Sequence, residues 1–310
     1  MNLYSRIAAI ALGASLFALP TTVRADTTLH VATTPIELGA QVLYAKDQGF
    51  FKKAGLDVEV QLISSGGAIA PAVASGSLDI AQSNLVSLAT AHEKGLPFVV
   101  LAAAGLYDAD ASTTSLVVAK SSTIKTGKDL VGKTIAVNGL RNITEVGASA
   151  WVDREGGDAS KVHFIEMPFP QMAAALESGR VDAAVIAEPE LSVAIAGGAR
   201  IIAQPFTAIA KQFLIGAWFS TTTWAKDHPD LVKRFVAATI EGGVWANGHR
   251  AESAKILEKY TKIHVSAEMK RTVYATRLEA SDVQPLIEAA ARYHAIKASF
   301  PAADLFVLAK

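Results

Sequence analysis

The chain contains no cysteine, so it can form no disulfide bond and offers no thiol to bind a metal or act as a nucleophile. A lipid attached through an N-terminal cysteine is excluded for the same reason. Aromatic residues make up only 7% of the 310 residues, and 29 basic side chains balance 29 acidic ones. This charge balance does not indicate a nucleic acid or an anionic membrane surface as a partner.

Long apolar runs are also scarce, and the one near the N-terminus is short for a membrane span. Ile7–Leu19 has 13 residues, whereas a spanning helix needs about 20. Arg6 precedes this run, and Val23-Arg24-Ala25 resembles the small-x-small site of a cleaved export signal. We therefore predict that residues 1–25 are a signal peptide and that the mature protein, starting at Asp26, is a soluble protein of the periplasm.

Sequence signatures of several chemistries are missing. The chain has no G-x-S-x-G nucleophile elbow, no G-x-G-x-x-G turn and no Walker loop. Its seven histidines are scattered, and none has the short spacing of a metal site. We therefore predict neither a cofactor nor a bound metal ion.

One pattern occurs twice, with landmarks 103 to 108 residues apart. Each copy begins with an apolar run that ends in polar residues, at Leu29–Thr34 and Thr134–Asn138. A helical segment opening on Gly-Ala and a second strand follow. Each copy closes on Gly, a Leu/Val-Asp pair and a third strand, at Gly76–Ala81 and Gly179–Ala184. Two βαβ copies predict two α/β lobes, and the cleft between two lobes is a place to bind a small ligand.

The order of the copies requires the chain to cross from one lobe to the other and to return. We expect these hinge crossings near residues 111–114 and 206–214. Lobe 1 is then predicted to comprise residues 26–112 and 214–310, and lobe 2 residues 113–213.

The residues after the second crossing are expected to form one strand and then helices. Phe213–Ser220 has the β-branched and aromatic content of a strand. Pro229 marks a helix start. Further helices are predicted at Ala251–Tyr260, Ala267–Glu279 and Asp282–Ala295, and we expect the C-terminal helices to pack on lobe 1.

Ligands of open α/β sheets bind beyond the carboxyl ends of the strands, near helix N-termini with free N–H groups. The loops at these positions are small, polar or glycine-rich, so a ligand can approach the backbone closely. Each Ser, Thr or Asn there can equally be an ordinary N-cap. The candidate ligand-binding residues are Thr33, Thr34, Ser64, Ser65, Gly66, Gly67, Ser83, Asn84, Asn138, Arg141, Asn142 and Glu188.

For three charged residues in or near these loops, the sequence suggests a specific role. Arg141 lies in the loop before the first helix of lobe 2, where a guanidinium can bind a carboxylate or sulfonate through two parallel hydrogen bonds. The alternative for Arg141 is a solvated surface residue. Glu188 follows the third strand of lobe 2 and can accept from a ligand amine or hydroxyl, or cap a helix. Glu37, early in a helix of lobe 1, is expected to serve the helix dipole.

Five segments spread over nearly the whole mature chain form a pattern that is specific when they are taken together. They are Ala45–Leu56, Gly76–Ile80, Asp129–Val137, Gly179–Ala184 and His228–Val232. With these segments the chain resembles the periplasmic solute-binding proteins of ABC importers of the nitrate/sulfonate/taurine type, the SsuA/THI5-like or NMT1-like family. The resemblance implies an α/β fold of type II periplasmic binding proteins, with two lobes, two hinge crossings and closure on a ligand. It also implies delivery of that ligand to an ABC permease with its ATPase.

Two differences between this chain and other members of the family concern the activity and the ligand. Pyrimidine synthases of the superfamily carry a cysteine cluster, which this chain lacks, so the resemblance argues against an enzyme. Alkanesulfonate binders usually have Trp-Asp-Pro where this chain has Ala187-Glu188-Pro189, which argues against simple alkanesulfonate specificity.

We therefore predict an exported, monomeric solute-binding protein without enzymatic activity. Its expected ligand is small and polar, an organic anion such as a sulfonate, taurine or an aromatic carboxylate, or nitrate. Two alternatives stay open. One is a periplasmic lyase or dehydratase on the same scaffold, with Glu188 as general acid. The other is a sensor subunit that presents its ligand to a receptor.

Overall fold

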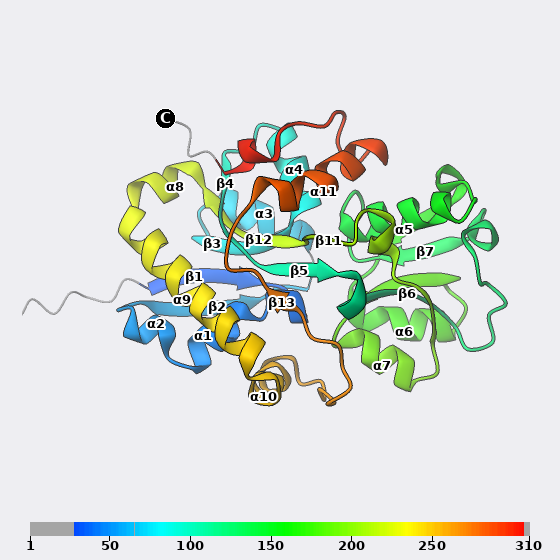
Figure 1. Ribbon diagram of the computed structural model, residues 1–310, viewed down its shortest axis with the longest axis horizontal. Coiled ribbons are helices and arrows are strands. Elements are labelled where there is room, and N and C mark those ends of the chain that lie inside the picture. Colours follow the sequence, from blue (N-terminus) through cyan, green and yellow to red (C-terminus); the bar gives the residue numbers. More distant parts are fainter. Residues whose placement is uncertain (1–27, 65, 307–310) are drawn as a thin grey trace, which may run out of the picture.

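The structure is a computed structural model that describes residues 28–64 and 66–306. The predicted signal peptide, residues 1–25, lies outside the described residues. Figure 1 shows two α/β lobes side by side, one containing the blue and the yellow-to-red parts of the chain and the other the green part. Within residues 28–64 and 66–306, no helix has both the length and the apolar character that a membrane span requires.

Lobe 1 is built on a five-stranded sheet. In spatial order its strands are β2 (Asp57–Leu62), β1 (Thr28–Thr33), β3 (Ile80–Asn84), β12 (Gly216–Thr221) and β4 (Phe98–Ala103). Strand β1 is parallel to β2 and β3, whereas β12 is antiparallel to β3 and β4.

Lobe 2 repeats this arrangement. Its strands are β8 (His163–Glu166), β7 (Thr134–Val137), β9 (Ala183–Ala187), β6 (Thr114–Val118) and β10 (Arg200–Ala203). Strand β7 is parallel to β8 and β9, and β6 is antiparallel to β9 and β10. The fourth strand of each sheet, β12 or β6, follows a crossing from the other lobe, so the two lobes match strand by strand.

The helices cover the sheets, and the C-terminal ones contact lobe 1. Helices within the two copies are α1 (Gln41–Asp47), α2 (Phe50–Lys53), α3 (Gly66–Ala74), α4 (Leu85–Glu93), α5 (Ile143–Arg154), α6 (Phe169–Glu177) and α7 (Glu190–Ala196). The C-terminal helices are α8 (Thr222–Asp227), α9 (Pro229–Gly248), α10 (Arg250–Thr261) and α11 (Ala280–Arg292). Helix α9 packs on α1 and α2, α10 on α1, and α11 on α4, with a further contact between α11 and α5 of lobe 2.

The repeated Leu/Val-Asp pair has the same structural role in both lobes. The His30 N–H donates to Asp79 Oδ2 at 2.8 Å, and the Asp79 N–H donates back to the His30 carbonyl. In lobe 2 the Thr134 N–H donates to Asp182 Oδ2, also at 2.8 Å, and Asp182 returns the bond. Each aspartate therefore ties the start of the third strand to the first strand, which explains why the pair recurs.

The repeated Gly-Ala permits a close approach in each lobe. A Cβ at Gly39 would lie 2.2 Å from Thr33 Oγ1, whose hydroxyl donates to the Gly39 carbonyl. A Cβ at Gly147 would lie 2.4 Å from the ring of Phe206. Any larger residue would push the helical segment away from its neighbour at these two positions.

The sheet of lobe 2 separates two apolar clusters by strand alternation. Along β6, Leu116 and Val118 point into a cluster confined to lobe 2, whereas Val117 joins the larger cluster that continues into lobe 1. Strand β7 alternates in the same way, with Ile135 on one face and Ala136 on the other. The core therefore runs from lobe 1 through the junction onto one face of the second sheet.

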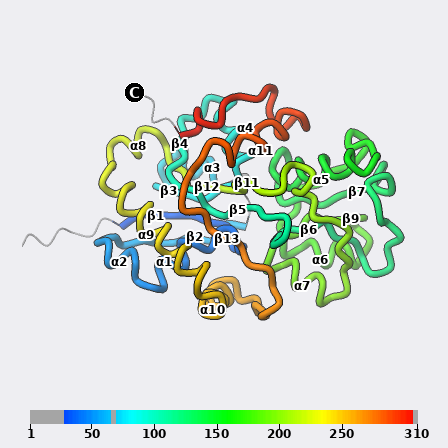
Figure 2. Tube along the Cα trace, viewed as in Figure 1, coloured from blue at the N-terminus to red at the C-terminus, as the bar shows by residue number. Residues whose placement is uncertain are grey.

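The two crossings meet in a small third sheet. It is antiparallel and consists of β11 (Gln212–Leu214), β5 (Gly105–Asp108) and β13 (Val273–Tyr274). The chain path in Figure 2 leaves lobe 1 through β5 and returns through β11. The predicted single strand Phe213–Ser220 is wrong in one respect, because Ile215 separates β11 from β12 and these strands belong to different sheets.

The predicted helix Ala267–Glu279 is also wrong, because this segment contains the strand β13. Tertiary contacts override its helical pattern. Tyr274 pairs with Gly105 of β5, and its backbone N–H and carbonyl both bind the side chain of Asn247 on α9. The two-lobed α/β fold is as predicted, whereas the lobe limits at residues 112–113 and 213–214 remain a prediction; the chain changes sheets between β4 and β6 and between β10 and β12.

Candidate ligand-binding site

A cavity lies between the lobes at the carboxyl ends of β1, β3, β7 and β9. Its empty volume, counted together with the open solvent at its mouth, is about 610 Å³. Its polar lining consists of Thr34, Glu37, Gln82, Ser83 and Asn84 from lobe 1 and of Thr113, Thr114, Asn138, Thr144 and Glu188 from lobe 2.

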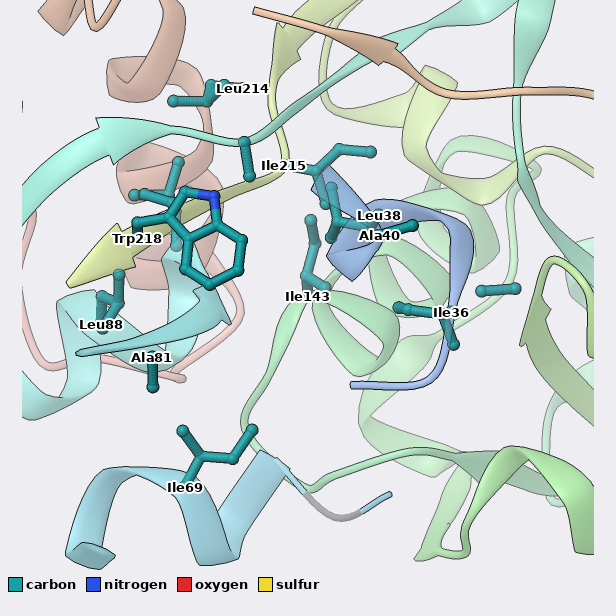
Figure 3. Packing of buried hydrophobic residues seen from close by; sticks show 14 of the residues in the cluster. Ile36, Leu38, Ala40, Ile69, Ala81, Leu88, Ile143, Leu214, Ile215 and Trp218 are labelled. Carbon is teal, nitrogen blue, oxygen red and sulfur yellow. The ribbon is translucent and has the colours of Figure 1, made fainter. Parts of the chain in front are cut away.

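The apolar lining comes from both lobes as well. Figure 3 shows Ile36, Leu38 and Ile215 of lobe 1 next to Ile143, the first residue of α5 in lobe 2. Ile69, Phe169, Ala187 and Phe206 complete the apolar lining. A ligand in this cavity would meet branched aliphatic side chains and phenyl rings between the polar groups.

Five of the residues predicted from the sequence lie together in this cavity. They are Thr34, Ser83, Asn84, Asn138 and Glu188. They come from the ends of four different strands, as expected for the carboxyl ends of strands in α/β sheets, and their contact with a ligand stays a prediction.

The other predicted residues lie elsewhere. Thr33 is fully buried, and its hydroxyl donates to the Gly39 carbonyl at 2.9 Å. Ser64 lines a smaller neighbouring pocket, and Gly66 and Gly67 are the first residues of α3. Ser65 lies outside the described residues.

Arg141 does not line the cavity but connects the lobes beside it. Its backbone is left-handed, with φ of 57°, and its N–H donates to Glu145 Oε2 at 2.7 Å. The guanidinium Nη2 donates to the carbonyl of Ala295, just beyond α11, at 2.9 Å. In this arrangement Arg141 holds α11 to the start of α5; its predicted contact with an anionic ligand stays a prediction.

Side chains cap three helices that begin at the cavity. The Ser87 N–H of α4 donates to Asn84 Oδ1, and the Thr144 N–H of α5 donates to Asn142 Oδ1, both at 3.0 Å. Ser192 of α7 donates in the same way to Glu188 Oε2, at 3.0 Å. Asn84, Asn142 and Glu188 therefore satisfy backbone donors that an anion would otherwise bind.

Burial also perturbs Glu188, the acid that lobe 2 contributes to the cavity. Its side chain is buried, and this burial raises the pKa of its carboxyl group to about 7. Hydrogen bonds from Ser192 oppose the shift, whereas the nearby negative charge of Glu37 adds to it. Near neutral pH the carboxyl group can therefore donate or accept a proton.

Glu37 lies in the first turn of the 3-10 helix Glu37–Gly39, as expected, and is also a buried ion-pair partner; its service to the helix dipole stays a prediction. Arg271 Nε donates to its Oε1 at 2.7 Å. The other guanidinium nitrogens bind the Arg250 carbonyl, the Tyr44 hydroxyl and the Ser253 hydroxyl. Burial raises the pKa of Glu37, and the Arg271 charge opposes this shift.

The backbone joins the two glutamates across the cavity. The Glu37 N–H donates to the Glu188 carbonyl at 3.0 Å, and the Glu188 N–H donates to the Thr113 carbonyl at 2.9 Å. Since Glu37 belongs to lobe 1 and Glu188 to lobe 2, the first of these bonds joins the two lobes directly.

Sequence reasoning missed several lining residues. Gln82 directly precedes Ser83 on β3, and Thr113 and Thr114 were assigned only to a crossing, so their strand-end positions could have pointed to them. Arg271 could not be linked to Glu37, because 234 residues separate the two. In the described part of the chain, no group of three or more His, Asp or Glu side chains could hold a metal ion.

Relatives with known names match a large part of the chain. A taurine-binding periplasmic protein of Escherichia coli is 28% identical over 196 residues, which cover 63% of this chain and 59% of the relative. A Bacillus subtilis protein assigned as aliphatic sulfonates-binding is 28% identical over 237 residues, 73% of this chain and 70% of the relative. A formylaminopyrimidine-binding protein of Halalkalibacterium halodurans is 28% identical over 141 residues, 46% of this chain and 41% of the relative.

Solved structures share the fold at lower identity. The periplasmic nitrate-binding protein NrtA from Synechocystis has a TM-score of 0.77 and 18% identity, with 91% of this chain and 85% of that chain covered. The desulfurization enzyme DSZB has a TM-score of 0.67 and 15% identity, with 90% and 96% covered. The fold therefore carries both binding proteins and an enzyme.

The family model described as NMT1/THI5 like matches residues 39–253, which include β2, β3, β7, β9 and most of the cavity lining. The chain spans about three fifths of the length of its taurine-binding relative. On the strength of the family match, which covers well over half of the chain, this protein belongs to the NMT1/THI5-like family.

Proposed function

We propose that this protein is an exported solute-binding protein that captures a small polar ligand between its lobes and delivers it to an ABC permease with its ATPase. The observation that carries the proposal is the cavity at the lobe junction, lined by strand ends from both lobes. Relatives that bind taurine and aliphatic sulfonates support the same role.

The contacts between the lobes support closure on the ligand. The Glu37–Glu188 backbone bond and the Arg141–Ala295 bond both join the lobes, so an opening rotation would break them. The crossings β5 and β11 form the hinge, where Tyr107 and Phe213 pack with ring centroids 5.0 Å apart. A ligand that contacts both lobes favours the closed state by those extra contacts.

A panel of ligands tests this function directly. Taurine, alkanesulfonates, nitrate, aromatic carboxylates and aminopyrimidines would be screened by thermal shift on the mature protein, followed by calorimetry. We expect at least one class to bind, with a smaller radius of gyration in small-angle scattering when it is bound. Saturable binding without any compaction would contradict closure, and no binding by the whole panel would contradict the proposed role.

Export and delivery need a cellular test. We expect mass spectrometry of the periplasmic fraction to find a chain that starts near Asp26. Deletion of the gene should abolish uptake of the identified ligand, and restoration of the gene should rescue it. Retention of residues 1–25 on a membrane-bound chain would contradict the predicted localisation.

A lyase or dehydratase is a second candidate because of one observation. The pKa of about 7 at Glu188 suits a general acid, and the fold of the desulfurization enzyme is similar. Incubation of each bound ligand with the protein, followed by product analysis, separates the two. Turnover that Glu188→Gln abolishes would favour the enzyme, whereas unchanged ligand would favour the binding protein.

A further inference from the structure

The charges around the cavity point to the class of ligand. Its lining contains two carboxylates, those of Glu37 and Glu188, and no lysine, arginine or histidine among the described residues. An anion placed there would lose its hydration and gain no cationic partner, and such burial is costly. The lining therefore opposes a ligand whose only polar group is an anion.

The nearest buried cation is already engaged. Arg271 is 7% exposed, and each of its guanidinium nitrogens makes a hydrogen bond to a protein oxygen. A ligand anion would have to replace Glu37 in this network. Arg141 does not line the cavity, and its Nη2 donates to the Ala295 carbonyl.

Both carboxylates keep free acceptor capacity, since Glu37 Oε2 also has no hydrogen-bond partner among the described residues, but only Glu37 has a cation bound to it. A carboxylate offers about four lone pairs, and the Ser192 N–H occupies one of them. No basic side chain lies against Glu188 in the cavity lining. An N–H group of a ligand would donate a further hydrogen bond to this buried carboxyl group. If that group is cationic, it would also supply the positive charge that Glu188 otherwise lacks.

A second observation also indicates a polar ligand. Gln82 is 1% exposed and lines the cavity, and among the described residues its Nε2 has no hydrogen-bond partner. Its Oε1 accepts from the Thr34 hydroxyl at 3.4 Å. A buried amide with an unused donor is costly, so an acceptor atom on the ligand would satisfy it.

We propose that the ligand is a small nitrogenous molecule, an amidine, an amine or an amino-substituted ring, which donates an N–H group to Glu188 and is neutral or cationic rather than purely anionic. This inference rests on the proposed solute-binding function. The apolar walls formed by Ile36, Ile143 and Phe169 suit a flat hydrocarbon or heterocyclic body. Neutral amino-pyrimidines and zwitterions with an ammonium group fit this description, whereas nitrate and simple alkanesulfonates do not.

Two isosteric pairs of probes test the sign of the charge. Benzamidinium and benzoate have the same shape and opposite charge, and so have guanidinium and nitrate. Calorimetry would compare the four probes on the wild-type protein, Glu188→Gln and the control Glu177→Gln, an exposed carboxylate at the end of α6. We expect the cation of each pair to bind more tightly than the anion to the wild-type protein.

The variants connect that preference to Glu188. Loss of a charge-assisted hydrogen bond should weaken benzamidinium binding by about 10- to 150-fold in Glu188→Gln. Glu177→Gln should bind as the wild type does. Tighter binding of benzoate and nitrate than of their cations would overturn the inference and leave the solute-binding function intact, as would equal benzamidinium affinity in Glu188→Gln. If none of the four probes and no member of the wider ligand panel binds, the proposed function falls as well.

Discussion

Glu37 and Glu188 are buried carboxylates that line one cavity from different lobes, with exposed fractions of 1% and 5%, but their partners differ. Glu37 has its own cation, because Arg271 binds it at 2.7 Å from the segment before β13. Glu188 accepts from Ser192 of helix α7, and no basic side chain of the described residues forms an ion pair with it. The paired carboxylate belongs to the scaffold of lobe 1, and the one without a cation is available to a ligand.

One carboxylate of the cavity therefore stabilises the fold, and the other can contact a ligand. A buried ion pair is stable only while both partners remain, so the Glu37–Arg271 pair fixes the C-terminal segment to lobe 1. A buried carboxyl group without a cation gains from a ligand donor, so it favours the closed, ligand-bound state.

Removing Arg271, the cation of the buried Glu37–Arg271 ion pair, should have the largest effect on stability. Arg271→Met leaves Glu37 buried without a partner, and breaking a buried pair in this way costs about 3–5 kcal/mol. Denaturant unfolding of the mature protein would measure the loss. Arg277→Met is the matched control, since the Arg277 side chain is 81% exposed and should matter little. A loss below about 1 kcal/mol in Arg271→Met would mean that Glu37 is not held as an ion in the folded protein.

Glu188 should make stability depend on pH. The folded protein raises the Glu188 pKa from 4.5 to about 7, so the folded state binds more protons than the unfolded state between these values. Stability of the ligand-free protein should therefore fall as pH rises from 4.5 to 7, by at most about 3 kcal/mol. Glu188→Gln should remove this part of the slope and be more stable than the wild type at pH 8. Unfolding curves at pH 5 and pH 8 that shift equally in wild type and variant would contradict the assignment.

Arg141 should have a smaller effect that does not depend on the charge of the ligand. Arg141→Ala removes one bond between the lobes, to the Ala295 carbonyl, which is worth about 0.5–1.5 kcal/mol. Ligand affinity should then fall by roughly 2- to 13-fold for cationic and anionic probes alike. Arg141→Lys should recover part of it. A loss confined to anionic probes would instead support the expectation from the sequence that Arg141 reads an anion.

The sequence was a good guide where a local pattern repeats. The Asp79 and Asp182 pairs and the Gly39 and Gly147 contacts recur because each lobe needs the same local geometry. Strand ends could be located from apolar runs, which placed Thr34, Ser83 and Asn138 in the cavity.

The features that the sequence did not predict depend on contacts between segments that are distant in the chain. Residues 267–279 have a helical pattern, but pairing with β5 and the contact between Arg271 and Glu37 make part of them a strand. Arg141 has the expected loop position, yet its left-handed backbone accompanies a guanidinium that reaches α11 rather than the cavity. No local pattern encodes these long-range partners. The sequence could therefore predict that a charged residue lies in a given loop, but not which distant group its side chain contacts.

The ionisation of Glu188 is the most direct test of the contrast between the two carboxylates. Carbon-13 NMR of the glutamate carboxyl groups, assigned with Glu188→Gln, would follow the wild-type protein from pH 4 to pH 9 without ligand and with saturating benzamidinium. We predict a pKa of about 7 for ligand-free Glu188 and a lower pKa in the complex, because the bound cation favours the ionised carboxylate. A Glu188 resonance that titrates near 4.5 in the ligand-free protein and does not respond to benzamidinium would contradict the account.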